Sequence, residues 1–280
     1  MQETTPATWT RATNWRQGHV LPMEAAQELG LMHSEAPDDT CVVVISHDCD
    51  LANDIDIEPE VELIPGRILP EANGNFLGGK SPRTLHLRML RDNTTVVVEL
   101  LNTAKRTALK TALAQWQPDG VYSLPPREWV TLQGWLASRY RRAAFANNLV
   151  ARMKATGAET ALANALKKHG SLVAAVYFRV EGGPQIERAP GDPYELTIVL
   201  MFDPGNDAEA SSQAANTLAE QLARTLRAKF DGQADMRLRD CIPISEDDVT
   251  VRMVKSLSQW RLEYMTHRAA QEQPGPPDAP

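Results

Sequence analysis

Five consecutive polar residues, Ser46-His47-Asp48-Cys49-Asp50, form one localised cluster of side chains that could do chemistry. Asp48 and Asp50 could share a divalent cation through their carboxylate oxygens, and His47 or Cys49 would adapt the set to a softer transition metal. Cys49 could instead act as a thiolate nucleophile, because a neighbouring imidazolium favours that form. His47, Asp48, Cys49 and Asp50 are therefore the candidate catalytic residues, and Asp48 and Asp50 are the candidate metal ligands.

A structural role for the same residues is the alternative. Successive side chains of an extended chain point to opposite sides, so His47 and Asp48 can share one site only if the chain turns there. A buried Cys49 would behave as a small apolar residue, and Asp48 or Asp50 would cap a turn.

Strands are predicted around and after this cluster. Residues 41–45 are all apolar, which indicates a strand that is buried on both faces. Residues 60–65, 84–90 and 94–101 are short, rich in Val, Ile and Leu, and bounded by turn residues, with Asp92-Asn93 as a hairpin turn. These strands predict a small barrel or a strongly twisted sheet, with residues 71–80 as a long mobile loop between two of them.

Helical spacing dominates the centre of the chain, and helices and strands then alternate. Asp207 is suited to cap the start of one helix and Gly232 to end the same helix, while Gly170 is suited to end the helix before them. We expect helices over 103–116, 128–154, 159–169, 207–230 and 251–267, and strands over 171–180, 194–202 and about 236–243.

A basic and aromatic cluster lies in the second of these helices. Arg139, Arg141 and Arg142 occur close to Trp135, and such residues can pair with phosphate and stack on a base, so these three arginines are the candidate nucleic-acid-binding residues. The alternative is an amphipathic helix whose aromatic side chains belong to the core and whose arginines form a solvated face.

Composition narrows the classes of function. The 280 residues have a formal net charge of −7, which argues against a general affinity for nucleic acid but leaves room for local basic patches. No apolar run approaches the length of a membrane span and the first residues lack the plan of a secretory signal, so we expect a cytoplasmic protein. Cys41, Cys49 and Cys241 are too few and too scattered for a disulfide framework and are expected to be reduced thiols.

Two segments of the N-terminal region are similar to the PemK/MazF-like family of SH3-like barrels. Residues 15–20, Trp-Arg-Gln-Gly-His-Val, resemble the family's opening turn, and residues 41–46, Cys-Val-Val-Val-Ile-Ser, resemble its following strand. His19 stands where the family has Asp, and Thr40-Cys41 stands where it has Arg-Pro. The resemblance therefore implies the barrel and a link to nucleic acid, but the arginine that toxins of this family use in RNA cleavage has no counterpart here.

Two shorter resemblances concern the cluster itself. Ser46-x-x-Cys49-Asp50-Leu51 looks like a segment of a set of uncharacterised bacterial proteins, for which it implies no established activity. Asp48-x-Asp50 after an apolar strand resembles the nucleophile motif of haloacid-dehalogenase-type phosphatases, with Asp247-Asp248 as the only candidate for the later acidic motif.

The predicted fold class is α+β, with a small SH3-like β-barrel followed by helices and a C-terminal α+β layer. The predicted divisions are a flexible N-terminus at 1–12, the barrel at 13–105, a helical segment at 106–170, an α+β domain at 171–267 and a disordered tail at 268–280.

Two main functions are open at this point, and a thiol mechanism at Cys49 is a third option. The first is recognition of nucleic acid or a protein partner by a bacterial protein, in a toxin–antitoxin, phage-defence or mobile-element setting that rests on the resemblance alone. The second is a metal-dependent hydrolase or phosphatase centred on residues 47–50, with a divalent metal as cofactor.

Overall fold

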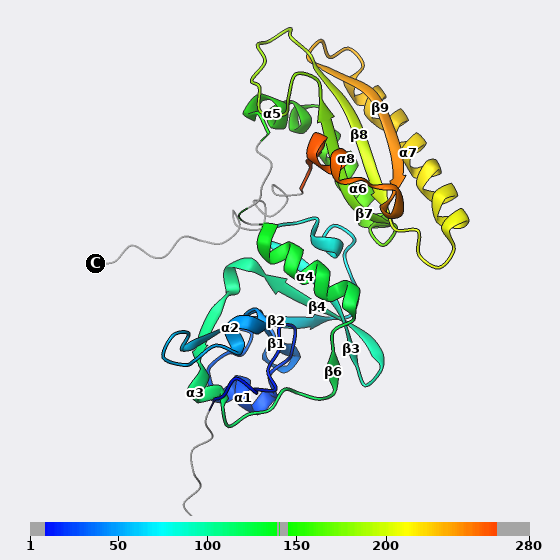
Figure 1. The fold of residues 1–280 in the computed structure, drawn as a ribbon. Coiled ribbons are helices and arrows are strands. Elements are labelled where there is room, and N and C mark those ends of the chain that lie inside the picture. Colours follow the sequence, from blue (N-terminus) through cyan, green and yellow to red (C-terminus); the bar gives the residue numbers. More distant parts are fainter. Residues whose placement is uncertain (1–8, 139, 141–144, 262–280) are drawn as a thin grey trace, which may run out of the picture. The chain divides into compact units, whose positions relative to one another are not determined.

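The computed structural model describes residues 9–138, 140 and 145–261, and these form two compact units (Figure 1). Unit 1 comprises the chain up to Ala72 together with Arg83–Ala137, and unit 2 comprises Asn73–Pro82 together with the chain from Ser138 onward. The predicted α+β class is confirmed. None of the helices in the described residues has both the length and the apolar character needed to cross a membrane.

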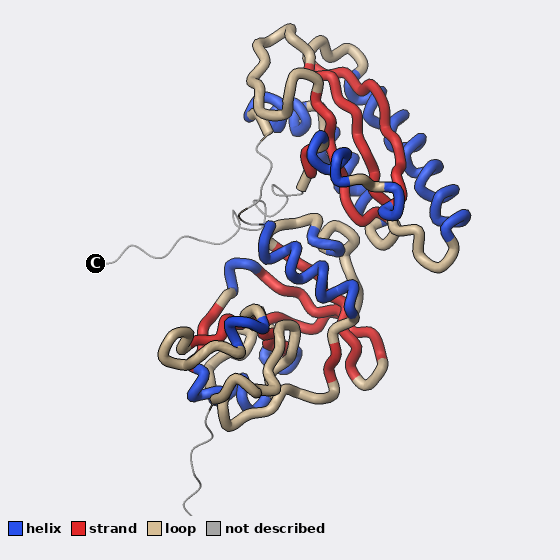
Figure 2. The backbone as a smooth tube through the Cα atoms, viewed as in Figure 1, coloured by secondary structure: helices blue, strands red, loops and turns tan. Residues whose placement is uncertain are grey.

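Unit 1 is built on a curled antiparallel sheet that forms half a barrel (Figures 1 and 2). The strand order is β1-β2-β4-β3-β6, and β5 also pairs with β2. The predicted hairpin turn is confirmed, because Asp92 and Asn93 both have positive φ between β3 and β4. The strands are β1 (Thr40–Val44), β2 (Glu60–Leu69), β3 (Thr84–Arg91), β4 (Thr94–Leu101), β5 (Arg106–Leu109) and β6 (Tyr122–Ser123).

The long strand β2 is shared by three neighbours and contains a close approach at Gly66. A Cβ atom at Gly66 would lie 2.6 Å from the carbonyl oxygen of Glu99 on β4, so only glycine fits there. The first half of β2 pairs with β5 and the second half with β4, while β1 runs along its middle. This exchange of partners accompanies the curl of the sheet.

Strand β1 is buried along its whole length, as its unbroken apolar sequence predicts. Cys41, Val43 and Ile45 face one core cluster, and Val42 and Val44 face another. The first cluster includes Leu132 and Trp135, so the interpretation of that helix's apolar side chains as core is confirmed for these two residues. The described part of unit 1 also contains four α-helices: α1 (Met23–Glu28), α2 (Asp48–Leu51), α3 (Lys110–Leu113) and α4 (Pro126–Ser138).

Unit 2 has a four-stranded sheet in the order β10-β7-β8-β9. Strands β7 and β8 are antiparallel, and α7 connects β8 to β9, which runs parallel to β8. One core cluster joins these strands to α5, α6 and α7. The elements are α5 (Asn147–Ala155), α6 (Ala158–His169), β7 (Val173–Val180), β8 (Tyr194–Phe202), α7 (Ala208–Phe230), β9 (Met236–Ser245), α8 (Val251–Ser256) and β10 (Ser258–Gln259).

Three predicted helices are wrong in extent. The stretch 103–116 forms a 3₁₀ turn (Asn102–Ala104), β5 and the short α3, because β2 offers an edge with which β5 pairs. The stretch 128–154 contains α4, which ends at Ser138, and α5, which begins at Asn147, and the described residues between them (140, 145 and 146) are not helical. The last helix ends at Ser256, and the chain becomes extended so that Trp260 stacks on Phe178 with a centroid distance of 4.6 Å.

The prediction of a mobile loop over residues 71–80 is wrong for the part that belongs to unit 2, the segment Asn73–Pro82. Leu77, in the 3₁₀ turn Leu77–Gly79, is buried, as is Lys80 at 2% exposed. The Lys80 ammonium donates to the carbonyl oxygens of Gly170 (3.0 Å) and Val173 (2.8 Å), which are parts of unit 2. Hydrogen bonds from a charged donor to buried carbonyl oxygens hold a segment in place. The polar and glycine-rich composition of this segment therefore does not indicate mobility.

Gly170 ends α6 as predicted, but for a different reason. Its φ is −69°, a value that any residue adopts, so the left-handed conformation that favours glycine after a helix is absent. A Cβ at Gly170 would lie 2.2 Å from the Cα of Gly74. Glycine is required because two backbones meet there.

This contact gives a first prediction. Gly170→Ala should lower the free energy of unfolding by more than about 2 kcal/mol, because the added methyl has backbone on its far side and cannot be accommodated. Gly134→Ala is the matched control, since the residue is inside α4 and no atom of another part of the described chain lies within 4 Å of a Cβ there. The control should gain about 0.5–1 kcal/mol from helix propensity. Urea unfolding followed by circular dichroism measures both, and equal stabilities would contradict the contact.

Candidate functional site

The predicted cluster forms a turn and the short helix α2, directly after β1. Ser46 is buried, and its hydroxyl accepts a hydrogen bond from the backbone N–H of Glu62 at 2.8 Å. His47 is the N-cap of α2, and its Nδ1 accepts from the backbone N–H of Cys49 at 3.2 Å. Leu51 is fully buried and anchors the helix in the core. The chain therefore turns at the point where the sequence required it to turn for side chains to share a site.

The four predicted catalytic residues do not all face one site. Asp48 and Cys49 line an open pocket of about 670 Å³, whereas His47 and Asp50 are exposed and do not line it. Asp48 also has a structural role, because its Oδ1 accepts from the backbone N–H of Gln17 at 2.8 Å. The structural interpretation of the cluster therefore applies to Asp48, and its catalytic role stays a prediction.

The predicted metal centre has no geometric support in the described part of the chain. Among residues 9–138, 140 and 145–261, no three His, Cys, Asp or Glu side chains converge in a way that could hold a metal ion. Asp48 faces the pocket and Asp50 does not. The divalent metal and the catalytic role of these residues remain predictions.

The predicted nucleic-acid-binding residues Arg139, Arg141 and Arg142 lie outside the described residues. Two other arginines, Arg11 and Arg16, line the pocket beside Asp48 and Cys49. Composition gave no signal for Arg11. Arg16 belongs to the segment that resembles the barrel family, and this was the one hint that it could matter.

The turn from Arg16 to His19 brings Arg16 to the pocket. The Arg16 guanidinium donates to the carbonyl oxygens of Thr13 (2.6 Å) and Trp15 (2.7 Å), and its backbone N–H donates to Nδ1 of His19 (3.1 Å). Partial burial lowers the pKa of His19, the charge of Arg16 lowers it further, and Asp48 opposes both effects. The lowered pKa favours the neutral imidazole, which is the form in which Nδ1 can accept that hydrogen bond.

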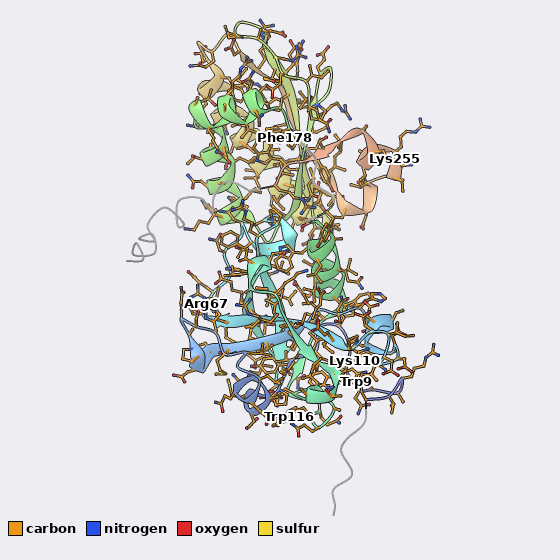
Figure 3. The ribbon with its side chains drawn as sticks, turned by 90° about the vertical axis from the view of Figure 1, so that its left-hand side faces the viewer. Trp9, Arg67, Lys110, Trp116, Phe178 and Lys255 are labelled. Carbon is orange, nitrogen blue, oxygen red and sulfur yellow. The ribbon has the colours of Figure 1, made fainter. Side chains whose placement is uncertain are left out.

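Trp9 closes another side of the pocket. Its indole N–H donates to the carbonyl oxygen of Leu51 at 2.8 Å, and the Lys110 ammonium lies 5.8 Å from its ring centroid. Figure 3 shows Trp9 and Lys110 at the same end of unit 1. This cation–π distance is within the attractive range.

Lys110 is the buried cation that organises this region. It is 0% exposed, and its Nζ donates to the carbonyl oxygens of Asp50 (2.6 Å) and Asn53 (3.1 Å), at the end of α2 and just after it. Burial lowers the pKa of Lys110, while Glu58, Asp50 and Asp54 act in the opposite direction. The ammonium therefore fixes the loop that carries one wall of the pocket.

A second polar network of unit 1 was missed by sequence reasoning. Register places Arg67 of β2 and His86 of β3 on either side of Glu99 of β4. Glu99 accepts from Arg67 at 2.8 Å and lies 3.3 Å from Nε2 of His86, and the hydrogen bond with His86 is the main reason that the pKa of Glu99 is lowered. Only strand register reveals this group, because its members are far apart in sequence.

The role of Lys110 can be tested by stability. Lys110→Met keeps the length and apolar stem but leaves two carbonyl groups without their charged donor, so unfolding should require about 2–3 kcal/mol less. Limited proteolysis should also cut faster between residues 52 and 58. Lys105→Met is the control, and it should change stability by less than about 0.5 kcal/mol. Unchanged stability and cleavage in Lys110→Met would refute this role.

The exposed thiol gives a second test. Burial raises the pKa of both Cys41 and Cys241 to about 12, whereas Cys49 is exposed at the pocket. Iodoacetamide at pH 8 should therefore modify one thiol of the native protein, which intact-mass and peptide analysis would assign to Cys49. Cys49→Ser should take up no label over the same time. Rapid modification of a second cysteine would show that the cores are open.

Comparisons of the chain with protein-family models, with curated proteins and with solved structures give no match. The chemistry of the pocket is therefore inferred from its own side chains: one indole, two guanidinium groups, two carboxylates and one thiol, from Trp9, Arg11, Arg16, Asp48, Asp54 and Cys49.

Proposed function

We propose that unit 1 is a recognition module that binds nucleic acid by accepting one nucleotide in the pocket beside α2. The observation that carries this proposal is the composition of that pocket, in which Trp9 and two arginines meet the carboxylates of Asp48 and Asp54. Its volume of about 670 Å³ is within the range that small-molecule sites occupy.

Each kind of side chain suits one part of a nucleotide. Guanidinium groups bind phosphate through paired hydrogen bonds, and an indole offers a flat surface for a base. Carboxylates accept hydrogen bonds from the N–H groups on the edge of a base. A pocket that held only arginines would fit any anion, whereas this mixture distinguishes a nucleotide from inorganic phosphate.

The overall charge of the chain supports a local mode of binding. A protein with a net charge of −7 gains little from long-range attraction to phosphates, so affinity must come from contacts inside a defined site. Single-stranded nucleic acid fits this requirement because its bases are free to enter pockets.

The resemblance of residues 15–20 to the PemK/MazF-like family favours the same ligand class. Arg16 is the basic residue of that segment and lines the pocket. The family's cleaving arginine has no counterpart in this sequence, so the proposal is recognition without cleavage. A bacterial defence or mobile-element setting belongs to this proposal as its biological context.

The proposal is tested by titrating the full chain with the four 5′-mononucleotides and with short single-stranded DNA and RNA, using calorimetry. Arg11→Ala should weaken binding about tenfold, because one charge-assisted hydrogen bond to phosphate is lost, at about 1.4 kcal/mol. Arg106→Ala is the matched control, since Arg106 is exposed in the same unit and does not line the pocket. The control should bind like the wild type.

Two results would count against the proposal. One is the absence of binding to every nucleotide and oligonucleotide by the wild-type chain. The other is about one equivalent of bound divalent metal that disappears in the double variant Asp48→Ala/Asp50→Ala at unchanged stability, which would favour the hydrolase or phosphatase alternative.

A further inference from the structure

The pocket beside α2 has two ends of different chemistry. Trp9 belongs to one end, where its indole N–H donates to the carbonyl oxygen of Leu51 and the Lys110 ammonium lies 5.8 Å from the centroid of its ring. The same ammonium donates to the carbonyl oxygen of Asn53 at 3.1 Å, directly before Asp54 in the chain. Trp9 and Asp54, which both line the pocket, therefore lie at the same end of it.

The other carboxylate that lines the pocket, Asp48, lies at the opposite end of α2. Asp48 is the first residue of this helix, whereas Asp54 follows its last residue. The Oδ1 atom of Asp48 accepts from the backbone N–H of Gln17, in the turn that carries Arg16. The base stacks on Trp9 in the proposed function. The carboxylate placed at the edge of that base is therefore the one of Asp54.

The carboxylate of Asp54 is a positioned acceptor of hydrogen bonds. Its Oδ1 accepts from the backbone N–H of Asp56 at 2.9 Å, and this bond orients the group. An ionised carboxylate has about four lone-pair sites and no donor, so acceptor sites remain for a ligand. Asp54 is exposed at the pocket, which makes these sites accessible.

The four bases differ in how well they match such a group. Guanine has two neighbouring donors, N1–H and the 2-amino group, so it can form a pair of parallel hydrogen bonds to one carboxylate. Adenine and cytosine each have an amino donor next to a ring nitrogen that only accepts, and uracil has one N–H between two carbonyl oxygens. These three bases place an acceptor against the carboxylate, and two acceptors repel each other.

We propose that the pocket beside α2 selects guanine, with Asp54 accepting hydrogen bonds from N1–H and the 2-amino group of a base that stacks on Trp9. This inference deepens the proposed function and rests on it, because it requires a nucleotide in this pocket. It assigns to Asp54 the choice of base. The guanidinium groups of Arg11 and Arg16 supply affinity for phosphate, which all nucleotides share.

Calorimetric titration of the full chain with GMP, AMP, CMP and UMP tests the inference. GMP should bind at least about tenfold more tightly than each of the others, because only guanine forms the paired hydrogen bonds. IMP keeps the N1–H of GMP but lacks the 2-amino group. It should therefore bind about three- to tenfold more weakly than GMP, since one of the two bonds is lost.

Two variants of the same loop separate recognition from charge. Asp54→Asn keeps an oxygen for the N–H of Asp56 but replaces one acceptor with a donor, so the preference for GMP over AMP should fall below about threefold. Asp56→Asn is the matched control, because it removes the same charge next to the pocket and does not line it. It should keep the full preference. The ratio of the two affinities is the readout, since the loss of a negative charge strengthens the binding of every nucleotide.

The possible failures are distinguishable. The guanine site alone would be overturned by affinities for the four mononucleotides within about twofold of one another, by a preference for another base, or by an unaltered preference in Asp54→Asn. Binding of oligonucleotides without binding of any mononucleotide would also overturn it, and each of these results leaves the proposed function intact. If neither mononucleotides nor oligonucleotides bind, both proposals fail.

Discussion

The burial of β1 on both of its faces is the constraint on which unit 1 depends. Val43 packs into one core cluster and Val42 into another, so the strand can neither slip by one residue nor leave the sheet without exposing apolar surface on two sides. A strand fixed in this way sets the position at which the chain leaves the core. That position is Ser46, and the turn into α2 begins there with its hydroxyl bonded to β2.

After Ser46, the chain is held in place by hydrogen bonds between charged side chains and main-chain groups more than by apolar packing. The Asp48 carboxylate holds the turn before Gly18, and the Lys110 ammonium holds the end of α2. Both groups fix main chain and not side chains, which leaves Cys49, Arg11 and the remaining face of the pocket open to solvent. The pocket is thus a surface feature with a rigid frame.

The sequence predicted the elements that are set by apolar pattern and local turn chemistry. Strands β1 to β4, the turn at Asp92-Asn93 and the cap of α7 by Asp207 could all be found in this way. What it missed depends on distant partners. Residues 106–109 form a strand because β2 offers them an edge for pairing. Lys80 can be buried because carbonyl oxygens 90 and 93 residues away accept hydrogen bonds from its ammonium group.

The candidate site was found in part for the same reason. A reactive cluster after a buried strand can be read locally, and Asp48 and Cys49 do lie at a pocket. Arg11, Arg16 and Trp9 could not be assigned to it, because they come from a stretch with no periodicity. Trp9 is held at the pocket by its bond to Leu51 of α2, and Arg16 by its bond to Thr13 in its own turn.

The route of the chain through Asn73–Pro82 has a consequence for how this protein can evolve. Ten residues that lie between two strands of unit 1 in the sequence supply unit 2 with Gly74 against Gly170 and with Lys80 against the end of α6. Recombination near residue 138 would therefore transfer unit 2 without the segment Asn73–Pro82. The surface of unit 2 on which that segment packs would then be left uncovered. Unit 2 is complete only with this segment, because a residue larger than glycine at position 170 would collide with Gly74, which lies between two strands of unit 1 in the sequence.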